Sequence, residues 1–186
     1  MIWKNSIPFS NESNLLIMRK SVINLFVFIA MSVVITSCKI YRFTDASVDP
    51  NLKTYSVNPT INIAVIQNPR AASLLTEKLK DKFTSETRMD LVQQNADADF
   101  SCTITDYSVS PVILSDANTT AQNRLNVSVK VDFVNKLDAK KNFSQTFSDG
   151  ENFDANKQLN DVENSKINDI FDRIVQQIFN KTFGNW

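Results

Sequence analysis

The sequence predicts an α+β protein, a two-layer sandwich in which two helices pack on one face of a four-stranded mixed sheet. Apolar residues recur at helical spacing in 70–87 and 156–183. They alternate with polar residues in 98–110 and 124–135, as in half-buried strands. Each helix then has one apolar stripe and each strand one apolar face. The simplest packing lays both helices on the same side and leaves the other face of the sheet polar.

The first strand is predicted in two pieces, 53–57 and 61–66, the second with alternating Ile and Val. Pro59 and Pro69 confine this region to a sheet edge or to broken strands. A helix is predicted over 70–87, because an apolar stripe opposes a charged face and Pro69 suits the position before a first turn. The stripe comprises Ala71, Leu75, Leu79 and Phe83.

Three antiparallel strands are expected to complete the sheet. After a short strand at 91–92, the strand 98–110 is predicted to end at Pro111. A polar loop, 115–122, connects it to the next strand.

The strand 124–135 is the clearest, because five apolar residues on one face fix its register. A charged turn over 137–142 leads into a return strand, 143–147. A long helix is predicted over 156–183, with Gly184 as its C-cap. Its apolar stripe comprises Val162, Ile167, Ile170, Phe171, Ile174, Val175, Ile178 and Phe179.

The N-terminal residues are predicted to be a secretory signal and not part of the fold. Met18-Arg19-Lys20 precedes an apolar stretch, 22–35, and the small residues Thr36-Ser37 lead directly to Cys38. A cysteine in this place is typical of bacterial lipoproteins: its thiol carries diacylglycerol, and after cleavage it becomes the N-terminus. The alternative is a signal anchor with Cys38 as a buried thiol, but a membrane span needs about 20 apolar residues.

The predicted layout is a signal peptide over 1–37, a lipidated tether over 38–51 and one domain over 52–186. A signal that begins at Met18 fits this pattern better than one that begins at Met1. The mature chain holds 17 basic and 19 acidic residues, since three of the 20 basic and one of the 20 acidic residues lie in 1–37. This balance gives no basic excess for binding nucleic acid.

The composition also excludes the common catalytic constellations. The chain has no histidine, the usual general base and the commonest metal ligand, and only two glycines, too few for a phosphate-binding loop. We expect neither enzyme activity nor a metal or cofactor. Cys102, the second cysteine, lies in an alternating segment and is predicted to be a small core residue.

Several segments resemble the LptE family as found in Bacteroidetes. They are Leu79-Lys80-Asp81-Lys82-Phe83, the run Ile104 to Pro111, Ala121-Gln122-Asn123-Arg124-Leu125 with Val127, Val129, Val131 and Phe133 after it, Ile178-Phe179-Asn180-Lys181, and Asn185-Trp186. The resemblance covers nearly all of the chain after Cys38. It depends on pattern and phrase, since no catalytic signature is involved.

The resemblance implies a small outer-membrane lipoprotein on the periplasmic face, anchored by acyl chains such as palmitate on Cys38. Such proteins pair with the large β-barrel LptD, fill its lumen as a plug and help lipopolysaccharide reach the outer leaflet. Their fold is two helices on a four-stranded sheet. The chain departs from this pattern in its first strand, which carries two prolines. It also lacks an acidic cluster after Cys38, which fits retention on the periplasmic leaflet.

Lipopolysaccharide carries phosphates, so lysine and arginine are the expected binding residues. Arg124 and Lys130 lie six apart and therefore on the same, polar face of one strand. Lys136, Lys140 and Lys141 form a second basic group in the next turn. The alternative is that all five are solubilising surface charges, with Lys130 paired to a neighbouring carboxylate.

Two other functions stay open at this point. The segment 61–66 followed by a helix also resembles the opening of small periplasmic domains that activate peptidoglycan synthases or assist secretion channels. A hydrolase that uses carboxylates such as Asp106 or Asp116 is a further alternative, although no paired acidic motif accompanies them.

Overall fold

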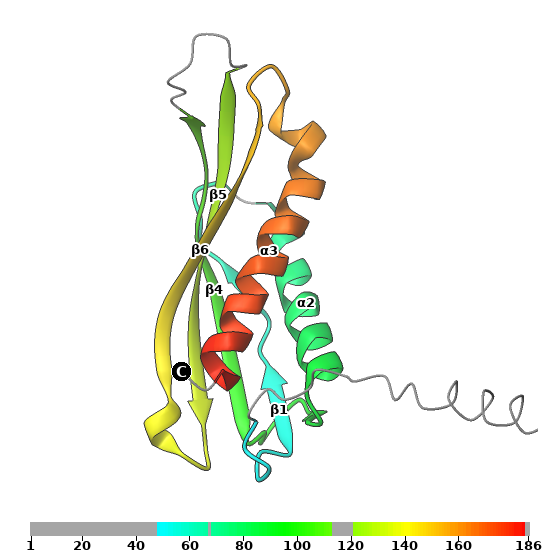
Figure 1. Cartoon of the computed structure of the whole chain (residues 1–186), viewed down its shortest axis with the longest axis vertical. Helices are drawn as coiled ribbons and strands as arrows, with labels where there is room; N and C mark the ends of the chain where they lie inside the picture. The colour runs from blue at the N-terminus through cyan, green and yellow to red at the C-terminus, as the bar shows by residue number, and fades with distance from the viewer. Residues whose placement is uncertain (1–47, 67, 113–120, 185–186) are drawn as a thin grey trace, which may run out of the picture. The chain divides into compact units, whose positions relative to one another are not determined.

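The computed structural model describes residues 48–66, 68–112 and 121–184. Its two longest strands, β4 (Ala98–Val112) and β5 (Gln122–Asn135), pair antiparallel from end to end at the centre of a sheet (Figure 1). The strand β6 (Phe143–Asp154) pairs antiparallel with β5. On the other side of β4 lie three short parallel strands. They are β1 (Thr54–Val57), β2 (Ile61–Asn62) and β3 (Asp90–Leu91).

The helices α2 (Ala71–Glu86) and α3 (Leu159–Phe183) lie side by side on one face of this sheet (Figure 1). The predicted two-layer α+β sandwich with both helices on one face is therefore confirmed. The predicted stripes are buried: Leu75, Leu79 and Phe83 of α2 have no exposed surface. The inward side chains of β5 are equally enclosed, since every second residue from Leu125 to Val131 is fully buried.

An aromatic cluster joins the two layers around Phe83 of α2. The ring of Phe83 lies 4.6 Å from Phe100 of β4 and 5.5 Å from Tyr55 of β1, measured between ring centroids. It also lies 6.1 Å from Phe179 and 5.8 Å from Phe183, both on α3. Because one side chain contacts four rings from three elements, Phe83 fixes both helices against the parallel end of the sheet.

The sheet has six strands among the described residues, and the prediction of four was wrong. The first predicted strand is divided between β1 and β2, which both pair with β4 at different heights. The short strand near residue 91 also joins the sheet, as β3 beside β1. The order is β3-β1-β4-β5-β6, with β2 on β4 beyond the end of β1.

The prediction that Pro111 ends its strand was wrong, because β4 continues through Pro111 to Val112. The reason is the local topology of the sheet. The pairing of β4 with β1 and β2 stops at Ile104, so the second half of β4 has a neighbour on one side only. A proline is tolerated on such an edge, where no ladder bond is lost.

The return strand and the last helix also have other bounds than predicted. The strand was expected to end at Phe147 but extends to Asp154, and the helix begins at Leu159 and not at 156. Asp154 ends the strand in a turn: its carboxylate accepts the backbone N–H of Asn156 at 2.9 Å, and its carbonyl accepts that of Lys157 at 3.0 Å. The residues expected in the first helical turn therefore belong to this connection.

The segment 61–66 is a strand only at Ile61–Asn62, and its large apolar side chains point outward. Ile61 and Ile63 are 61% and 62% exposed, whereas Ala64 is buried. Ile61 is paired with Thr103, which alternates with the buried residues of β4, so Ile61 lies on the side of the sheet away from the helices.

The predicted signal peptide, Cys38 and most of the predicted tether lie outside the described residues, as do Asp116 and most of the loop 115–122. In the described part, no helix combines the length and apolar character required to cross a membrane. Val48 packs against the core and Leu52 is buried within it.

Candidate functional site

The face of the sheet that carries no helix is lined mainly by polar side chains. We call it the open sheet face. Its side chains alternate with the buried residues of β4, β5 and β6, and direct cross-strand partners share the face. Its polar members are Asp99, Ser101, Thr103, Asp106, Ser108, Ser110, Arg124, Asn126, Ser128, Lys130, Asp132, Ser144, Thr146, Ser148 and Asn152. Val134, near the end of β5, is an exposed apolar residue on the same face. Hydroxyl and amide groups outnumber charges on it.

Hydrogen bonds between side chains hold the open sheet face in a fixed arrangement. The hydroxyls of Ser128 and Ser148 lie 2.8 Å apart, across β5 and β6. Asn126 donates from Nδ2 to Ser110 Oγ at 3.0 Å, across β5 and β4. Short side chains lose little conformational entropy on binding, and each hydroxyl can form further hydrogen bonds. The face is therefore suited to docking against a polar wall.

Arg124 lies on the open sheet face, as predicted, and is bonded within it. Its Nη1 donates to Asn152 Oδ1 at 3.1 Å, and its Nη2 lies 4.0 Å from the carboxylate of Asp149. Lys130 is on the same face, six residues or about 20 Å along β5. Its Nζ lies 3.5 Å from the carboxylate of Asp132, so Lys130 has the neighbouring carboxylate partner that the alternative reading expected.

The second predicted basic group lies at the far end of β5, in the β5–β6 turn that contains the 3-10 helix η1 (Ala139–Lys141). Lys136, Lys140 and Lys141 are all exposed there. Only Lys141 has a salt bridge, 3.8 Å from Asp49, when the described residues are considered. From Arg124 to Lys136 is about 40 Å along an extended strand. The five predicted cations therefore form two separate groups.

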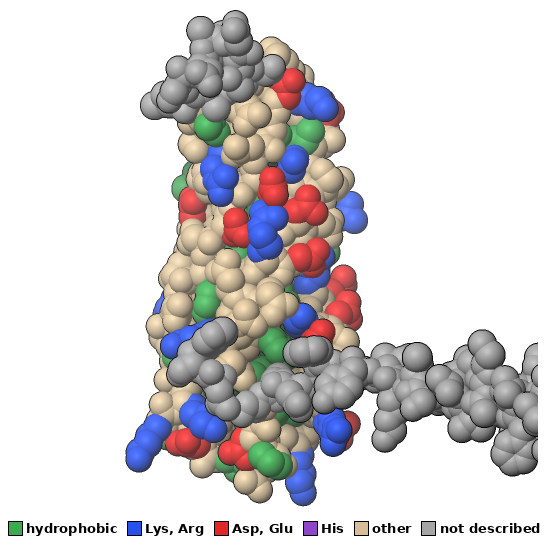
Figure 2. All heavy atoms as spheres, viewed as in Figure 1, with side chains coloured by type: hydrophobic (Ala, Val, Ile, Leu, Met, Phe, Trp, Pro, Cys, Tyr) green, Lys and Arg blue, Asp and Glu red, His purple; other side chains and the backbone are tan. Residues whose placement is uncertain are grey.

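A charge cluster between β6 and α3 was missed by the sequence reasoning. Arg173 of α3 bonds the carboxylate of Asp149 at 2.5 Å and that of Glu151 at 2.9 Å. Lys166 lies 3.9 Å from Glu151. Acidic and basic side chains gather where β6 meets α3 in the upper half of the molecule (Figure 2). The signal in the sequence that could have revealed this cluster is the pair of basic residues on α3, Lys166 and Arg173, which lie outside its apolar stripe.

Arg173 donates a hydrogen bond to the carboxylate of Asp149, and this bond raises the pKa of its guanidinium. The cluster joins the edge strand β6 to the helix layer at positions where the strand has no apolar side chains. Its groups bond one another, which is the pattern of a structural ion network.

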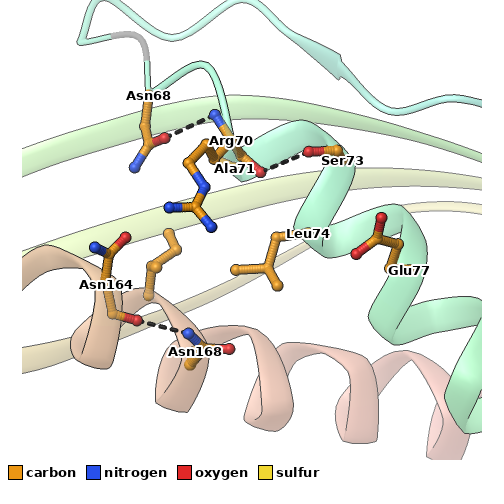
Figure 3. A pocket seen from close by; sticks show the side chains of 9 residues that line it. Asn68, Arg70, Ala71, Ser73, Leu74, Glu77, Asn164 and Asn168 are labelled. Atoms are coloured by element: carbon orange, nitrogen blue, oxygen red, sulfur yellow. Dashed lines mark hydrogen bonds between the residues drawn. The ribbon is translucent and has the colours of Figure 1, made fainter.

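A hollow of about 440 Å³ opens between the start of α2 and α3 (Figure 3). Arg70 and Leu74 extend from α2 toward α3, where Asn164 and Asn168 face them (Figure 3). The Ser73 hydroxyl donates to the carbonyl of Arg70 at 3.0 Å and so has no contact with a base. The lining residues are Asn68, Arg70, Ala71, Ser73, Leu74, Glu77, Asn164, Ile167 and Asn168. They provide amides and charges but no nucleophile activated by a base.

Two buried groups near the helices have a packing role. The Tyr107 hydroxyl donates to the carboxylate of Glu163 at 2.5 Å, and burial, followed by this bond, raises the pKa of the phenol. Burial also raises the pKa of the Cys102 thiol to about 12. Cys102 is 2% exposed, in agreement with the prediction of a core residue. Asp106, considered above as a catalytic carboxylate, accepts the Ser108 hydroxyl at 3.0 Å on the open sheet face.

The LptE lipopolysaccharide-assembly family matches residues 52–182. The chain belongs to the LptE family. No curated protein is significantly similar to it. The hypothetical protein CT253 from Chlamydia trachomatis has a similar fold, with a TM-score of 0.50 and 9% identity over 72% of this chain and 99% of that one.

Weaker likenesses to lipoproteins of known structure accompany this match to the LptE family. A minor lipoprotein from Acinetobacter baumannii is 15% identical over 70% of this chain and 91% of its own, with a TM-score of 0.46. The uncharacterized lipoprotein B from Nitrosomonas europaea is 16% identical over 69% of this chain and 80% of its own, with a TM-score of 0.42.

Proposed function

We propose that this LptE-family protein is a lipoprotein acylated at Cys38 and anchored to the periplasmic face of the outer membrane. There it pairs with a β-barrel of the LptD type as plug and assembly partner, and helps insert lipopolysaccharide into the outer leaflet. The family assignment supports the lipopolysaccharide role. The run Thr36-Ser37-Cys38 after an apolar stretch supports the anchor.

The observation that carries the pairing is the open sheet face. Every second residue of β5 and β6 lies on this face, and together these residues present a polar, hydrogen-bonded surface that no other part of the described chain covers. The interior of an outer-membrane barrel is polar. A rigid face of hydroxyls and amides can exchange hydrogen bonds with such a wall without burying unpaired charge. This arrangement requires no covalent chemistry and no enzyme activity.

Lipopolysaccharide phosphates are proposed to contact the exposed cations. Arg124 and Lys130 would do so from the open sheet face, and Lys136, Lys140 and Lys141 from the β5–β6 turn. Arg124 is held by Asn152, which orders its guanidinium for a bidentate phosphate contact. Charge reversal of Arg124 and Lys130 together, compared with charge reversal of the three turn lysines, tests the assignment by lipopolysaccharide binding to the full chain in detergent. If neither set weakens binding, the phosphate contacts lie elsewhere.

Site-specific photocrosslinking in cells tests the pairing. A photoreactive residue replaces Thr146 on the open sheet face or Gln176 on the exposed side of α3, both of which are exposed. We expect Thr146 to crosslink to a large outer-membrane barrel. Crosslinks from Gln176 as well agree with a plug enclosed on all sides. Crosslinks from Gln176 alone would show that the helix layer contacts the barrel, and none from either position would contradict the pairing.

A further inference from the structure

The β5–β6 turn displays an apolar side chain, and hydrogen bonds within the turn hold it in one conformation. Leu137 is 53% exposed. Asn135 Oδ1 accepts the backbone N–H of Leu137 and of Asp138, both at 2.9 Å, and Asn142 Oδ1 accepts that of Asn135 at 2.7 Å. These bonds fix the turn, so the exposure of Leu137 is imposed by its geometry.

The described chain begins beside this turn. Asp49 lies 3.8 Å from Lys141, and the carboxylate of Asp97 accepts the backbone N–H of Lys53 at 3.0 Å. The carbonyl of Asp97 accepts the N–H of Lys136 at 2.9 Å. The start of the described chain and the β5–β6 turn lie together at the lower end of the molecule (Figure 1).

Leu137 lies in the same turn as three exposed lysines, Lys136, Lys140 and Lys141. The stretch 136–141 has three lysines and one aspartate, a net charge of +2. The nearby carboxylates accept backbone N–H groups. Asp138 accepts that of Lys140 at 3.1 Å and Asp97 that of Lys53 at 3.0 Å. Asp49 accepts that of Asn51 at 3.0 Å and is also the salt-bridge partner of Lys141, whereas Lys136 and Lys140 have no salt bridge among the described residues. The tip of the turn is therefore apolar at its centre and cationic at its rim.

The length of chain before the domain sets how far this end can lie from the proposed anchor. Val48 is ten residue steps from Cys38, and a fully extended chain spans at most about 3.5 Å per step, or about 35 Å in all. The strand β5 alone, at about 3.3 Å per residue, is about 46 Å long. An anchor at Cys38 would thus keep the turn, and not the far end of β5, next to the bilayer.

We propose that the β5–β6 turn docks on the phospholipid leaflet that holds the Cys38 anchor. Leu137 enters the interfacial region, and Lys136, Lys140 and Lys141 lie at headgroup phosphates. This inference depends on the proposed lipidation but not on the pairing with a barrel. Lipopolysaccharide phosphates offer the same chemistry to these lysines. The short tether favours the phospholipids around the anchor as their source.

The test uses the full, lipidated protein in vesicles of phosphatidylethanolamine and phosphatidylglycerol, without lipopolysaccharide and without a barrel. An environment-sensitive maleimide dye is attached to Ala139→Cys in the turn or to Ala155→Cys beyond the other end of β6; both alanines are exposed. Cys102 is buried and does not compete for the dye. We expect brominated lipids to quench the dye at position 139 several-fold more than at position 155. Equal quenching at the two positions would overturn the proposal.

Variants in the Ala139→Cys background identify the contacts. Leu137→Ser, and separately Lys136→Gln with Lys140→Gln and Lys141→Gln, should each reduce the quenching toward the level of position 155. The matched control Lys157→Gln, an exposed lysine near position 155, should leave it unchanged. Quenching that ignores both turn variants would overturn the proposal. So would quenching that appears only when lipopolysaccharide is added to the vesicles, a result that would leave the proposed function intact.

Discussion

Arg124 lies against the backbone of Gly150 on the open sheet face, in space that any side chain at position 150 would occupy. An ideal Cβ on Gly150 would be 2.7 Å from Arg124 Nε, 2.7 Å from the carbonyl oxygen of Leu125 and 2.9 Å from Asn126 Oδ1. The missing side chain thus allows Arg124 to cross toward Asn152. Gly150, one of only two glycines in the chain, is therefore explained by the close approach of the Arg124 side chain to the strand backbone.

Gly150→Ala should destabilise the protein, although alanine in a strand is usually less destabilising than glycine. The added methyl group meets a backbone oxygen that cannot move without shifting β5, so we expect a loss of about 1–3 kcal/mol, as for overpacked sites. Urea unfolding followed by circular dichroism measures it. Thr146→Ala on the same face of β6 is the matched control and should change stability by less than about 0.5 kcal/mol. A Gly150→Ala protein as stable as this control would contradict the account of Arg124.

The aromatic cluster predicts a graded response at Phe83. Phe83→Leu keeps an apolar side chain but removes the ring contacts to Tyr55, Phe100, Phe179 and Phe183, and should cost about 1–2 kcal/mol. Phe83→Ala should cost about 3–5 kcal/mol. Chemical denaturation of the two variants gives both values. Val65→Ala, at a fully exposed position, should be close to neutral. Equal losses for leucine and alanine at position 83 would contradict this graded response.

The hydrogen bond between Tyr107 and Glu163 joins the middle of β4 to α3. Tyr107→Phe removes the only described donor to this carboxylate and should lower stability by about 1–3 kcal/mol at pH 7, because a partly buried acceptor is left unpaired. The double variant with Glu163→Leu should recover part of that loss, since both polar partners are then absent. A double-mutant cycle by urea unfolding measures the coupling. A cycle with no coupling energy would mean that the bond does not contribute.

The buried thiol of Cys102 predicts both low reactivity and a dependence of stability on alkaline pH. Its pKa in the folded protein is about 12, whereas the ordinary value is 9.0. The folded state therefore retains this proton at a pH where the unfolded chain has lost it. The contribution of this thiol to the free energy of unfolding is complete below about pH 9 and falls as the pH rises toward 12.

Two measurements follow from this. Ellman's reagent should not react with the native protein at pH 8 but should react fully in denaturing urea. Between pH 9 and 11 the unfolding free energy of the wild type should fall more steeply than that of Cys102→Ala, with tyrosine titration common to both. Parallel curves, or fast reaction of the native thiol, would contradict the burial of Cys102.

The parts of the fold that could be predicted are those where apolar periodicity and burial agree. The alternation in β5 and the stripe of α3 gave the register and the helix face correctly, because every predicted inward residue from Leu125 to Phe133 is buried. The second half of β6 could not be predicted in this way. Two of its three inward positions are Asp149 and Glu151, which are bonded to Arg173 of α3, so the apolar alternation is interrupted between Phe147 and Phe153.

The first strand shows the opposite failure. Its second piece alternates as a half-buried strand should, yet Ile61, Ile63 and Val65 point to solvent and Ala64 points inward. Periodicity identifies which residues share a face but does not decide which face is covered. Similarly, the sequence placed Arg124 and Lys130 on one face correctly. It could not show that Asn152 and Asp132 would be their neighbours, because those contacts depend on strand register and side-chain reach.

Affinity purification of the tagged, lipidated protein from detergent-solubilised outer membrane, followed by mass spectrometry, tests the proposed pairing with a barrel. We expect a large β-barrel of the LptD type in near-stoichiometric amount. We also expect that substitution of Ser128 and Thr146 on the open sheet face by arginine reduces the yield of that barrel. Recovery of a peptidoglycan synthase, a secretion channel or no partner at all would contradict the proposed pairing.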